Sequence, residues 1–292
     1  MSAFLDVDDL SVAELDSVLR RAAAMKADPG EWTATLADHS LAMLFEKPST
    51  RTRVSFETGM TQLGGHAQFL GPDDIQLGHG EPVKDTARAV SRYVDCIMGR
   101  LFDHADMEQL AAYATVPVVN GLTDDAHPCQ TLADLLTLRE HAPGASVAWV
   151  GDGNNVARSF VVGAAMEGLE LTVATPEGYG IEEGVRERAA GYEGSVSYTD
   201  DPVAAVEGAD VVYTDVWVSM GQEDRREEKL SAFEGFQVDD DLLGESHLLH
   251  CLPAHRGEEV TDAALESDRA LVWDQAENRM HAQKALLTHL LD

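Results

Sequence analysis

Short apolar runs and segments of helical periodicity alternate along most of the chain. In the first half, the apolar spacing predicts helices at 9–27, 49–63, 105–114 and 129–141, and buried strands at 39–47, 94–100 and 116–120. In the second half it predicts helices at 155–167, 182–190, 202–207 and 276–291, and strands at 146–152, 170–175, 195–198, 210–214, 247–253 and 270–275. Strands that alternate with helices are typical of parallel sheets covered by helices on both faces.

The two series are separated by a short polar break, HAPGAS, at 141–146. A chain of 292 residues is long enough for one large domain or two of ordinary size. Because there are two strand–helix series, we predict an α/β protein of two doubly wound domains with a cleft between them. Ligands of such sheets bind at the carboxyl ends of the strands, so the residues that follow each predicted strand are the candidates for a binding site.

The charge balance narrows the range of partners. Asp and Glu number 52 against 21 Lys and Arg, the formal net charge is -31, and only Lys26, Lys47, Lys84, Lys229 and Lys284 are lysines. Such a chain should repel nucleic acid and anionic membranes. The acids are dispersed, which favours a solvated surface suited to concentrated salt and hence a halophilic source. A merely acidic protein from a low-salt organism is the alternative.

Cysteine content and the N-terminus indicate the compartment. The three cysteines, Cys96, Cys129 and Cys251, form no CxxC pair, which argues against a disulfide framework and a structural zinc site and fits a reducing cytoplasm. The N-terminal residues are acidic and show no signal-peptide pattern. No apolar run approaches the roughly 18 residues of a membrane span. We therefore expect a cytoplasmic protein without membrane contact.

A phosphate-binding segment is predicted at FEKPSTRTRVSFE, 45–57. A buried strand there meets a helix start that carries Ser49, Thr50, Arg51, Thr52 and Arg53. Free backbone N–H groups, hydroxyls and guanidinium groups converge at such a start, and this combination suits an anion. The alternative is an ordinary serine N-cap with exposed arginines, but two arginines so close together stand out in a chain this acidic.

Two further segments carry polar groups at helix starts. In HPCQTLADLLTL, His127 and Gln130 flank a helix start, where the imidazole can donate to an oxyanion; a capped helix with a buried histidine is the alternative. In VAWVGDGNNVARS, a strand, a glycine turn and a helix start suggest a ligand, with Asn154 and Asn155 as polar contacts. The turn is a poor dinucleotide fingerprint, since Val156 occupies the third small position. A polar turn without a ligand remains an alternative.

Two strand ends in the second half complete the set. In YTDVWVSMGQE, Asp215 ends a strand, where it suits a cationic amine, although a capping aspartate would look the same. In HLLHCLPAHRGEEV, Cys251 precedes Pro253 at a strand end and is either a core residue or a tuned thiol. The neighbouring His250 and His255 have neither the spacing nor the second cluster of a zinc site.

Taken together, these segments resemble the aspartate/ornithine carbamoyltransferase family over nearly the whole chain. The motif STRTR at 49–53 is highly specific to that family, and HPCQ, DVWVSMG and HCLP resemble its ornithine branch. The resemblance implies a carbamoyl phosphate domain of residues 1–141 plus the C-terminal helix 276–292, an ornithine domain of residues 142–275, and interdomain helices that link them. It also implies a homotrimer, or a multiple of trimers, with sites at subunit interfaces.

The resemblance also implies roles for individual residues. It implies that carbamoyl phosphate is bound by Ser49, Thr50, Arg51, Thr52, Gln76 of a neighbouring subunit, Arg100, His127, Gln130, Cys251, Leu252 and Arg279. It implies that ornithine is bound by Asn155, Asp215, Ser219 and Met220, and that Arg100, His127, Asp215 and Cys251 take part in catalysis. Neither a metal nor another cofactor is required.

The chemistry that follows is transfer of a carbamoyl group to the δ-amine of L-ornithine, giving L-citrulline and phosphate. The alternatives are another amine acceptor (putrescine, an acylated ornithine or aspartate), a non-catalytic binding or sequestering subunit, and a nicotinamide-linked dehydrogenase suggested by GDGNN. An aspartate acceptor would be repelled by Asp215. The same chemistry serves arginine biosynthesis and, in reverse, arginine catabolism, so the sequence leaves the direction open.

Overall fold

The computed structural model describes residues 3–75 and 80–292, and the chain divides into two compact units. Unit 1 comprises the residues up to Leu136 together with Glu277–Asp292, and unit 2 comprises Thr137–Ala276. The sequence placed the first boundary at 141–142. Both dividing points fall within helices, namely α5 (Pro128–His141) and α12 (Val272–Leu291).

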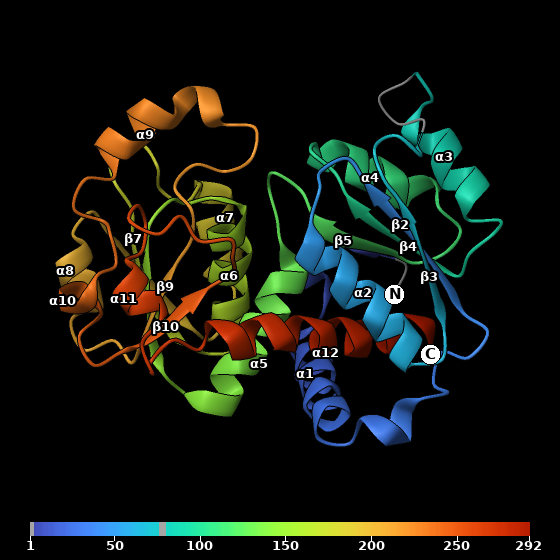
Figure 1. Ribbon diagram of the computed structural model, residues 1–292, viewed down its shortest axis with the longest axis horizontal. Coiled ribbons are helices and arrows are strands. Elements are labelled where there is room, and N and C mark those ends of the chain that lie inside the picture. Colours follow the sequence, from blue (N-terminus) through green and yellow to red (C-terminus); the bar gives the residue numbers. More distant parts are fainter. Residues whose placement is uncertain (1–2, 76–79) are drawn as a thin grey trace. The chain divides into compact units, whose positions relative to one another are not determined.

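Unit 1 is built on a five-stranded parallel sheet with the strand order β1-β5-β4-β2-β3 (Figure 1). Its strands are β1 (Ala3–Phe4), β2 (Ser40–Phe45), β3 (His66–Leu70), β4 (Cys96–Arg100) and β5 (Val118–Leu122). The helices that accompany them are α1 (Val12–Ala27), α2 (Thr50–Gln62), α3 (Val83–Val90) and α4 (His104–Tyr113), with 3-10 turns η1 (Val7–Asp9) and η2 (Pro29–Trp32).

Unit 2 repeats this plan with the strand order β10-β9-β6-β7-β8, also parallel. Its strands are β6 (Ser146–Val150), β7 (Glu170–Ala174), β8 (Ser195–Thr199), β9 (Val211–Thr214) and β10 (His247–His250). Its helices are α6 (Asn155–Met166), α7 (Glu183–Ala189), α8 (Pro202–Val206), α9 (Arg226–Ala232), α10 (Asp240–Leu243) and α11 (Asp262–Leu265), with the 3-10 turn η3 (Glu223–Arg225). The predicted fold class, two doubly wound α/β domains, is confirmed.

Local sequence explains where the elements begin and end. Helix α1 begins at Val12 rather than at 9, because Ser11 and Glu14 form a capping box in which each side chain accepts the other's backbone N–H. On the same helix, an i,i+4 ion pair joins Arg20 to Asp16 at 2.7 Å. In unit 2, Trp149, Phe160 and Tyr213 form a buried aromatic cluster with ring centroids 4.7–6.5 Å apart. This cluster anchors β6, α6 and β9 to one another.

One predicted strand is wrong. The stretch 270–275 makes only a single bridge, between Ala270 and Leu248, and helix α12 already begins at Val272. The apolar run there is short, and a short apolar run looks the same at the start of a buried helix as in a strand. The predicted strand 247–253 likewise ends early, at His250. Among the helices that the structure describes, none has both the length and the apolar character required to cross a bilayer.

Candidate active site

The residues predicted to bind phosphate follow the two central strands of unit 1. Strand β2 is followed in the chain by its neighbour β3, whereas β4 lies on the other side of β2. This reversal of direction is the point at which open α/β sheets bind ligands, beyond the carboxyl ends of the strands. Phe45, the last residue of β2, pairs with Arg100, the last residue of β4. The STRTR segment and Arg100 therefore share one edge of the sheet.

The start of α2 is organised by Ser49. Its hydroxyl accepts the backbone N–H of Thr52 at 3.2 Å and donates to the Thr52 hydroxyl at 3.0 Å. The first turn, Thr50 to Arg53, carries no acidic residue, although the chain has 52 of them. The positive end of the helix dipole is therefore not offset there, and it favours an anion.

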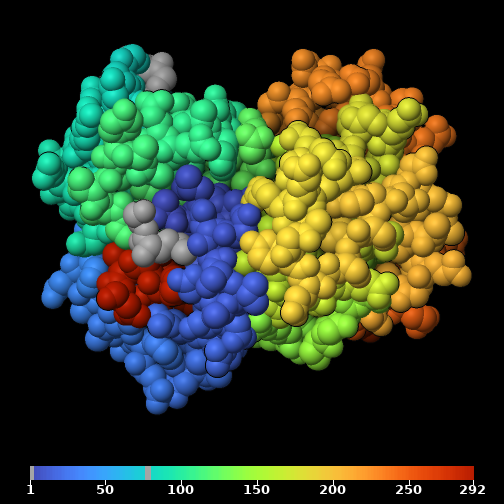
Figure 2. Space-filling model, turned by 180° about the vertical axis from the view of Figure 1, so that it is seen from behind, coloured from blue at the N-terminus to red at the C-terminus, as the bar shows by residue number. Residues whose placement is uncertain are grey.

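Helix α12 contributes Arg279 to the same helix start. The two helices pack closely at Gly59, where a Cβ would approach the Lys284 side chain to 3.2 Å, and Lys284 donates to Gln62 at 2.9 Å. Further along, the Arg279 guanidinium donates to the Thr52 hydroxyl at 2.9 Å. Figure 2 shows the red C-terminal residues of α12 next to blue N-terminal residues, in agreement with the 2.7 Å pair between Arg21 and Asp292. Residues more than 200 positions apart thus meet at the predicted phosphate site.

Arg100 and His127, together with Arg279, form the buried part of this site. Both are nearly inaccessible, at 5% and 4% exposure, and Arg279 is 3% exposed. Burial, followed by the charges of Arg279 and Arg100, holds the pKa of His127 well below its usual range. His127 is therefore a neutral imidazole beside two guanidinium groups. Neutral imidazole retains one N–H donor, so the group can stabilise an oxyanion without adding another buried charge.

The other candidate residues of unit 1 differ in their burial and partners. Gln130 is fully buried and donates to Asp134 at 2.8 Å, while its side-chain oxygen has no hydrogen-bond partner among the described residues. Thr50 is exposed and Arg51 is half-buried. Arg53, in contrast, bonds Glu57 and stacks 3.8 Å over the Phe69 ring, so it is held away from the helix start. Gln76 lies outside the described residues.

Unit 2 has the same kind of reversal at β6, which pairs with β7 on one side and with β9 on the other, although the strands β7 and β8 separate β6 from β9 in the chain. The GDGNN turn follows β6, and Asp215 follows β9. Gly151 has φ +147°, and a Cβ on Gly153 would lie 2.7 Å from the Tyr179 carbonyl oxygen, so glycine is required at both positions. The predicted polar turn therefore lies at the ligand-binding edge of the second sheet.

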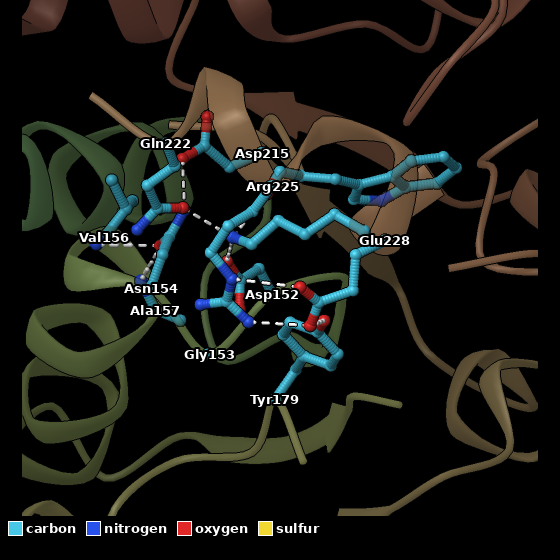
Figure 3. Close-up of polar contacts among 12 residues, drawn as sticks. Asp152, Gly153, Asn154, Val156, Ala157, Tyr179, Asp215, Gln222, Arg225 and Glu228 are labelled. Atoms are coloured by element: carbon cyan, nitrogen blue, oxygen red, sulfur yellow. Dashed lines mark hydrogen bonds and ion pairs between the residues drawn. The ribbon is translucent and has the colours of Figure 1, made fainter. Parts of the chain in front are cut away.

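Asp215 is held by two neighbours in a fixed orientation. Asn154 donates from Nδ2 to one carboxylate oxygen at 2.8 Å, and the Cys251 thiol donates to the other at 3.0 Å. Asn154 also caps α6, since its Oδ1 accepts the backbone N–H groups of Val156 and Ala157 at 3.0 and 3.1 Å (Figure 3). A carboxylate at 4% exposure with these partners suits a cationic or polarised amine.

Asn154 and Asn155 thus have different surroundings. The sequence offered both as ligand contacts, but the Asn154 side chain is occupied by the helix cap and by Asp215. Asn155 is half-buried at the first position of α6. Of the other predicted ornithine contacts, Ser219 is half-buried and Met220 is 47% exposed, in the loop that follows β9.

The loop that follows β9 is held in place by Lys229, a residue that the sequence did not indicate as functional. Lys229 is 2% exposed, and its ammonium donates to Asp152 at 2.6 Å, to the Trp217 carbonyl at 2.7 Å and to Gln222 at 2.6 Å. Burial raises the pKa of Asp152, while Lys229 opposes that shift. Next to Lys229 in α9, Glu228 pairs with Arg225 and accepts a hydrogen bond from Tyr179 (Figure 3). The sequence contains one indication that Lys229 is important, namely that lysine is rare in this chain.

The three cysteines are free thiols with different surroundings. Cys96 and Cys129 are completely buried, and burial raises the pKa of each to about 12. Cys251 is half-buried and follows β10, beside Leu252, whose φ of +60° is unusual for a non-glycine residue. Cys251 is therefore the accessible thiol of the three.

Comparison with known proteins gives matches along almost the entire chain. The family model described as "Aspartate/ornithine carbamoyltransferase, carbamoyl-P binding domain" matches residues 2–140, and "Aspartate/ornithine carbamoyltransferase, Asp/Orn binding domain" matches residues 143–290. A protein of Haloquadratum walsbyi named ornithine carbamoyltransferase is 62% identical over 99% of this chain and 98% of its own length. One of Halobacterium salinarum, named ornithine carbamoyltransferase, catabolic, is 49% identical over the full length of both chains.

A solved structure has the same fold as this chain. The ornithine carbamoyltransferase from Pyrococcus furiosus superimposes with a TM-score of 0.94 at 50% identity, covering 98% of this chain and 96% of that one.

Proposed function

The chain belongs to the aspartate/ornithine carbamoyltransferase family, and we infer that it is an ornithine carbamoyltransferase. It transfers the carbamoyl group of carbamoyl phosphate to the δ-amine of L-ornithine and yields L-citrulline and phosphate. The observation that carries this inference is the buried group of Arg100, Arg279 and His127 beside the capped start of α2, in a chain whose net charge is -31.

The phosphate group is assigned to the start of α2. Backbone N–H groups of its first turn, the hydroxyls of Ser49 and Thr50, and the guanidinium of Arg51 surround the phosphate in this proposal, while the Thr52 hydroxyl serves the carbamoyl oxygen. Arg279, already bonded to Thr52, adds charge from α12. These groups also stabilise phosphate as it leaves. The assignment of Gln76 from a neighbouring subunit remains a prediction.

The carbamoyl group is assigned to Arg100, His127, Thr52 and Gln130. The first three donate to the carbonyl oxygen, on which negative charge develops as the amine attacks. The amide oxygen of Gln130 is an available acceptor for the carbamoyl nitrogen. By resemblance, the carbonyls of Cys251 and Leu252 accept from the same nitrogen.

Ornithine is assigned to Asn155, Asp215, Ser219 and Met220 in unit 2. The δ-amine must lose a proton before it attacks, because its pKa is about 10.4 by analogy with lysine. Asp215, aligned by Asn154 and Cys251, is the proposed group that orients this amine and receives its proton. Positioning of the two reactants supplies much of the rate enhancement, and no covalent intermediate is needed.

The state and setting of the enzyme are part of the proposal. We propose a homotrimer, or a multiple of trimers, in the cytoplasm of an organism with high internal salt, in keeping with the dispersed acidic surface. Both anabolic and catabolic names occur among the relatives, and the H. salinarum relative is named catabolic. Comparing the affinity for ornithine with that for citrulline in the presence of phosphate would decide the direction.

An acceptor assay tests the function directly. Purified protein in buffered, concentrated KCl receives carbamoyl phosphate with ornithine or, in parallel, with putrescine, acetylornithine or aspartate. We expect citrulline from ornithine and no carbamoylated product from the other three, because Asp215 and the loop at 215–221 match the ornithine branch. Carbamoylation of another acceptor would overturn the ornithine assignment, and no product from folded protein would overturn the enzyme assignment itself.

A further inference from the structure

Glu259 is a buried carboxylate that the proposed mechanism does not use. It is 0% exposed, and its Oε1 accepts from His250 Nε2 at 3.0 Å and from the backbone N–H of His255 at 2.6 Å. Its Oε2 has no hydrogen-bond partner among the described residues. Burying a carboxylate with an unsatisfied oxygen is costly, so a specific function is the better explanation.

The two groups that Glu259 binds lie at the two ends of one turn. His250 ends β10, His255 follows five residues later, and Cys251 and Leu252 lie between them. A single carboxylate oxygen thus fixes the separation of the turn's ends. It does so from outside the turn, four residues beyond His255.

His250 transmits this restraint to the backbone of the turn. Its Nδ1 accepts the backbone N–H of Leu252 at 2.9 Å, so the ring proton is on Nε2 and points to Glu259. The backbone N–H of His250 is held in turn by Gln275 at 2.9 Å. The bond from His250 stabilises Leu252 at its φ of +60°, a region that side chains other than glycine rarely occupy.

The residues that this network holds in place, Cys251 and Leu252, are also residues to which the proposed reaction assigns a role. Cys251 donates to Asp215 at 3.0 Å, and the Cys251 and Leu252 carbonyls are assigned to the carbamoyl nitrogen. We propose that Glu259, acting through His250, is a positioning residue that fixes the Cys251–Leu252 backbone and thiol for carbamoyl transfer. This inference rests on the proposed function, because carbamoyl transfer is the reaction in which Cys251 and Leu252 are proposed to take part.

Metal binding is a weaker explanation of the same residues. His255, Glu258 and Glu259 bring ligand atoms within 4.8 Å of one another, as do Asp215, His250 and Cys251. However, both ring nitrogens of His250 are hydrogen-bonded, and Glu258 is paired with Arg226. A metal ion would have to displace these bonds, whereas a positioning role for Glu259 requires no change in them.

The test compares E259L, which removes the acceptor, with E259Q, which keeps one, and with E258Q at the neighbouring, more exposed glutamate. The first readout is kcat and KM for each substrate in concentrated KCl. The second is the rate at which iodoacetamide alkylates Cys251, a measurement that does not depend on enzyme activity. Cys96 and Cys129 are buried and should not react.

We expect E259L to lower kcat about tenfold or more, since small displacements of reacting groups are costly. Alkylation of Cys251 should become several-fold faster, because its thiol is no longer aligned with Asp215. E259Q and E258Q should stay within about threefold of wild type for both readouts. Should E259L fail to fold, H250F removes the same link while leaving Glu259 bonded to His255, and it should reproduce both changes.

Wild-type kcat and wild-type alkylation in folded E259L would overturn the proposal, as would equal losses in E259Q and E258Q. Absence of citrulline formation in the wild type would instead overturn the proposed function. In that case the alkylation rates still decide whether Glu259 orders the turn.

Discussion

At the scale of single residues, the same side chains build the fold and prepare the candidate site. Ser49 begins α2 and orients the Thr52 hydroxyl, which Arg279 then contacts. Asn154 begins α6 and orients Asp215. Because α2 follows β2 and α6 follows β6 in the chain, both capping side chains lie at the carboxyl edge of their sheet. The caps therefore link local folding to the site's geometry.

His127 provides a prediction at this scale. Its pKa is lowered in the fold, so the unfolded chain binds the proton first as pH falls, and the stability contributed by the neutral imidazole is lost below about pH 6.5. We expect the free energy of unfolding to fall by about 1 kcal/mol more between pH 7.5 and 5.5 in the wild type than in H127Q.

The measurement is the unfolding midpoint against pH at fixed KCl and protein concentration. His281, whose pKa burial also lowers, is unchanged in both proteins and cancels in the comparison. Parallel pH profiles for wild type and H127Q would show that His127 is not the group responsible.

Residues with local signals could be predicted from the sequence, whereas residues defined by distant partners could not. The STRTR motif and Arg100 at a strand end were recognisable, and the structure brings Arg279 to Thr52 from 227 positions away. Lys229 and Glu259, in contrast, sit in acidic stretches that read as ordinary surface. Their importance arises from burial against Asp152 and His250, which only the folded chain reveals.

At the scale of elements, both sheets place their candidate residues at the reversal of strand order. The alternation of strands and helices was sufficient to predict this class of fold. The two edge strands of unit 1 were missed: β3 has only half-buried or exposed residues, and β1 has only two residues. The error at 270–275 has a different cause, because a short apolar run looks the same in a buried strand as at the start of a buried helix such as α12.

The loop after β9 carries a prediction at this scale. Replacing Lys229 with methionine leaves Asp152 buried without its cation, which typically costs about 3–5 kcal/mol. Because the loop also loses its bonds at Trp217 and Gln222, we expect the KM for ornithine to rise about tenfold, with a smaller effect on the KM for carbamoyl phosphate.

Unfolding midpoints and the two KM values of K229M measure these effects, and K84M at an exposed lysine is the matched control. The double variant K229M/D152L should regain most of the stability, since it removes the uncompensated carboxylate, but not the affinity for ornithine. Full recovery of both would mean that the ion pair has no role in shaping the loop.

At the scale of the whole molecule, the distribution of charge is unusual. Of the five lysines, Lys47, Lys229 and Lys284 are buried. Lys47 pairs with Asp124 and lies 4.3 Å from the Phe102 ring centroid, and Lys284 contacts Gln62. The surface is therefore more acidic than composition alone suggests, and acids repel one another across it.

We expect this repulsion to make stability depend on salt. Because the Debye length falls to about 3 Å at 1 M salt, raising KCl from about 0.1 M to about 3 M should raise the unfolding midpoint by about 10 °C or more. Thermal unfolding across a KCl series measures the effect. Glycine betaine at equal osmolality is the control because it does not screen charge, and an equal gain in betaine would count against the electrostatic explanation.

The burial of three lysines also determines how the protein can be derivatised. Acylating reagents attack unprotonated, accessible amines, and the side chains that qualify are Lys84, which is exposed, and Lys26, which is half-buried and bonded to Asn278. Both belong to unit 1. Apart from the terminal amine, a dye or a solid support coupled by this chemistry would therefore be attached to unit 1 and would leave Lys229 in α9 unmodified.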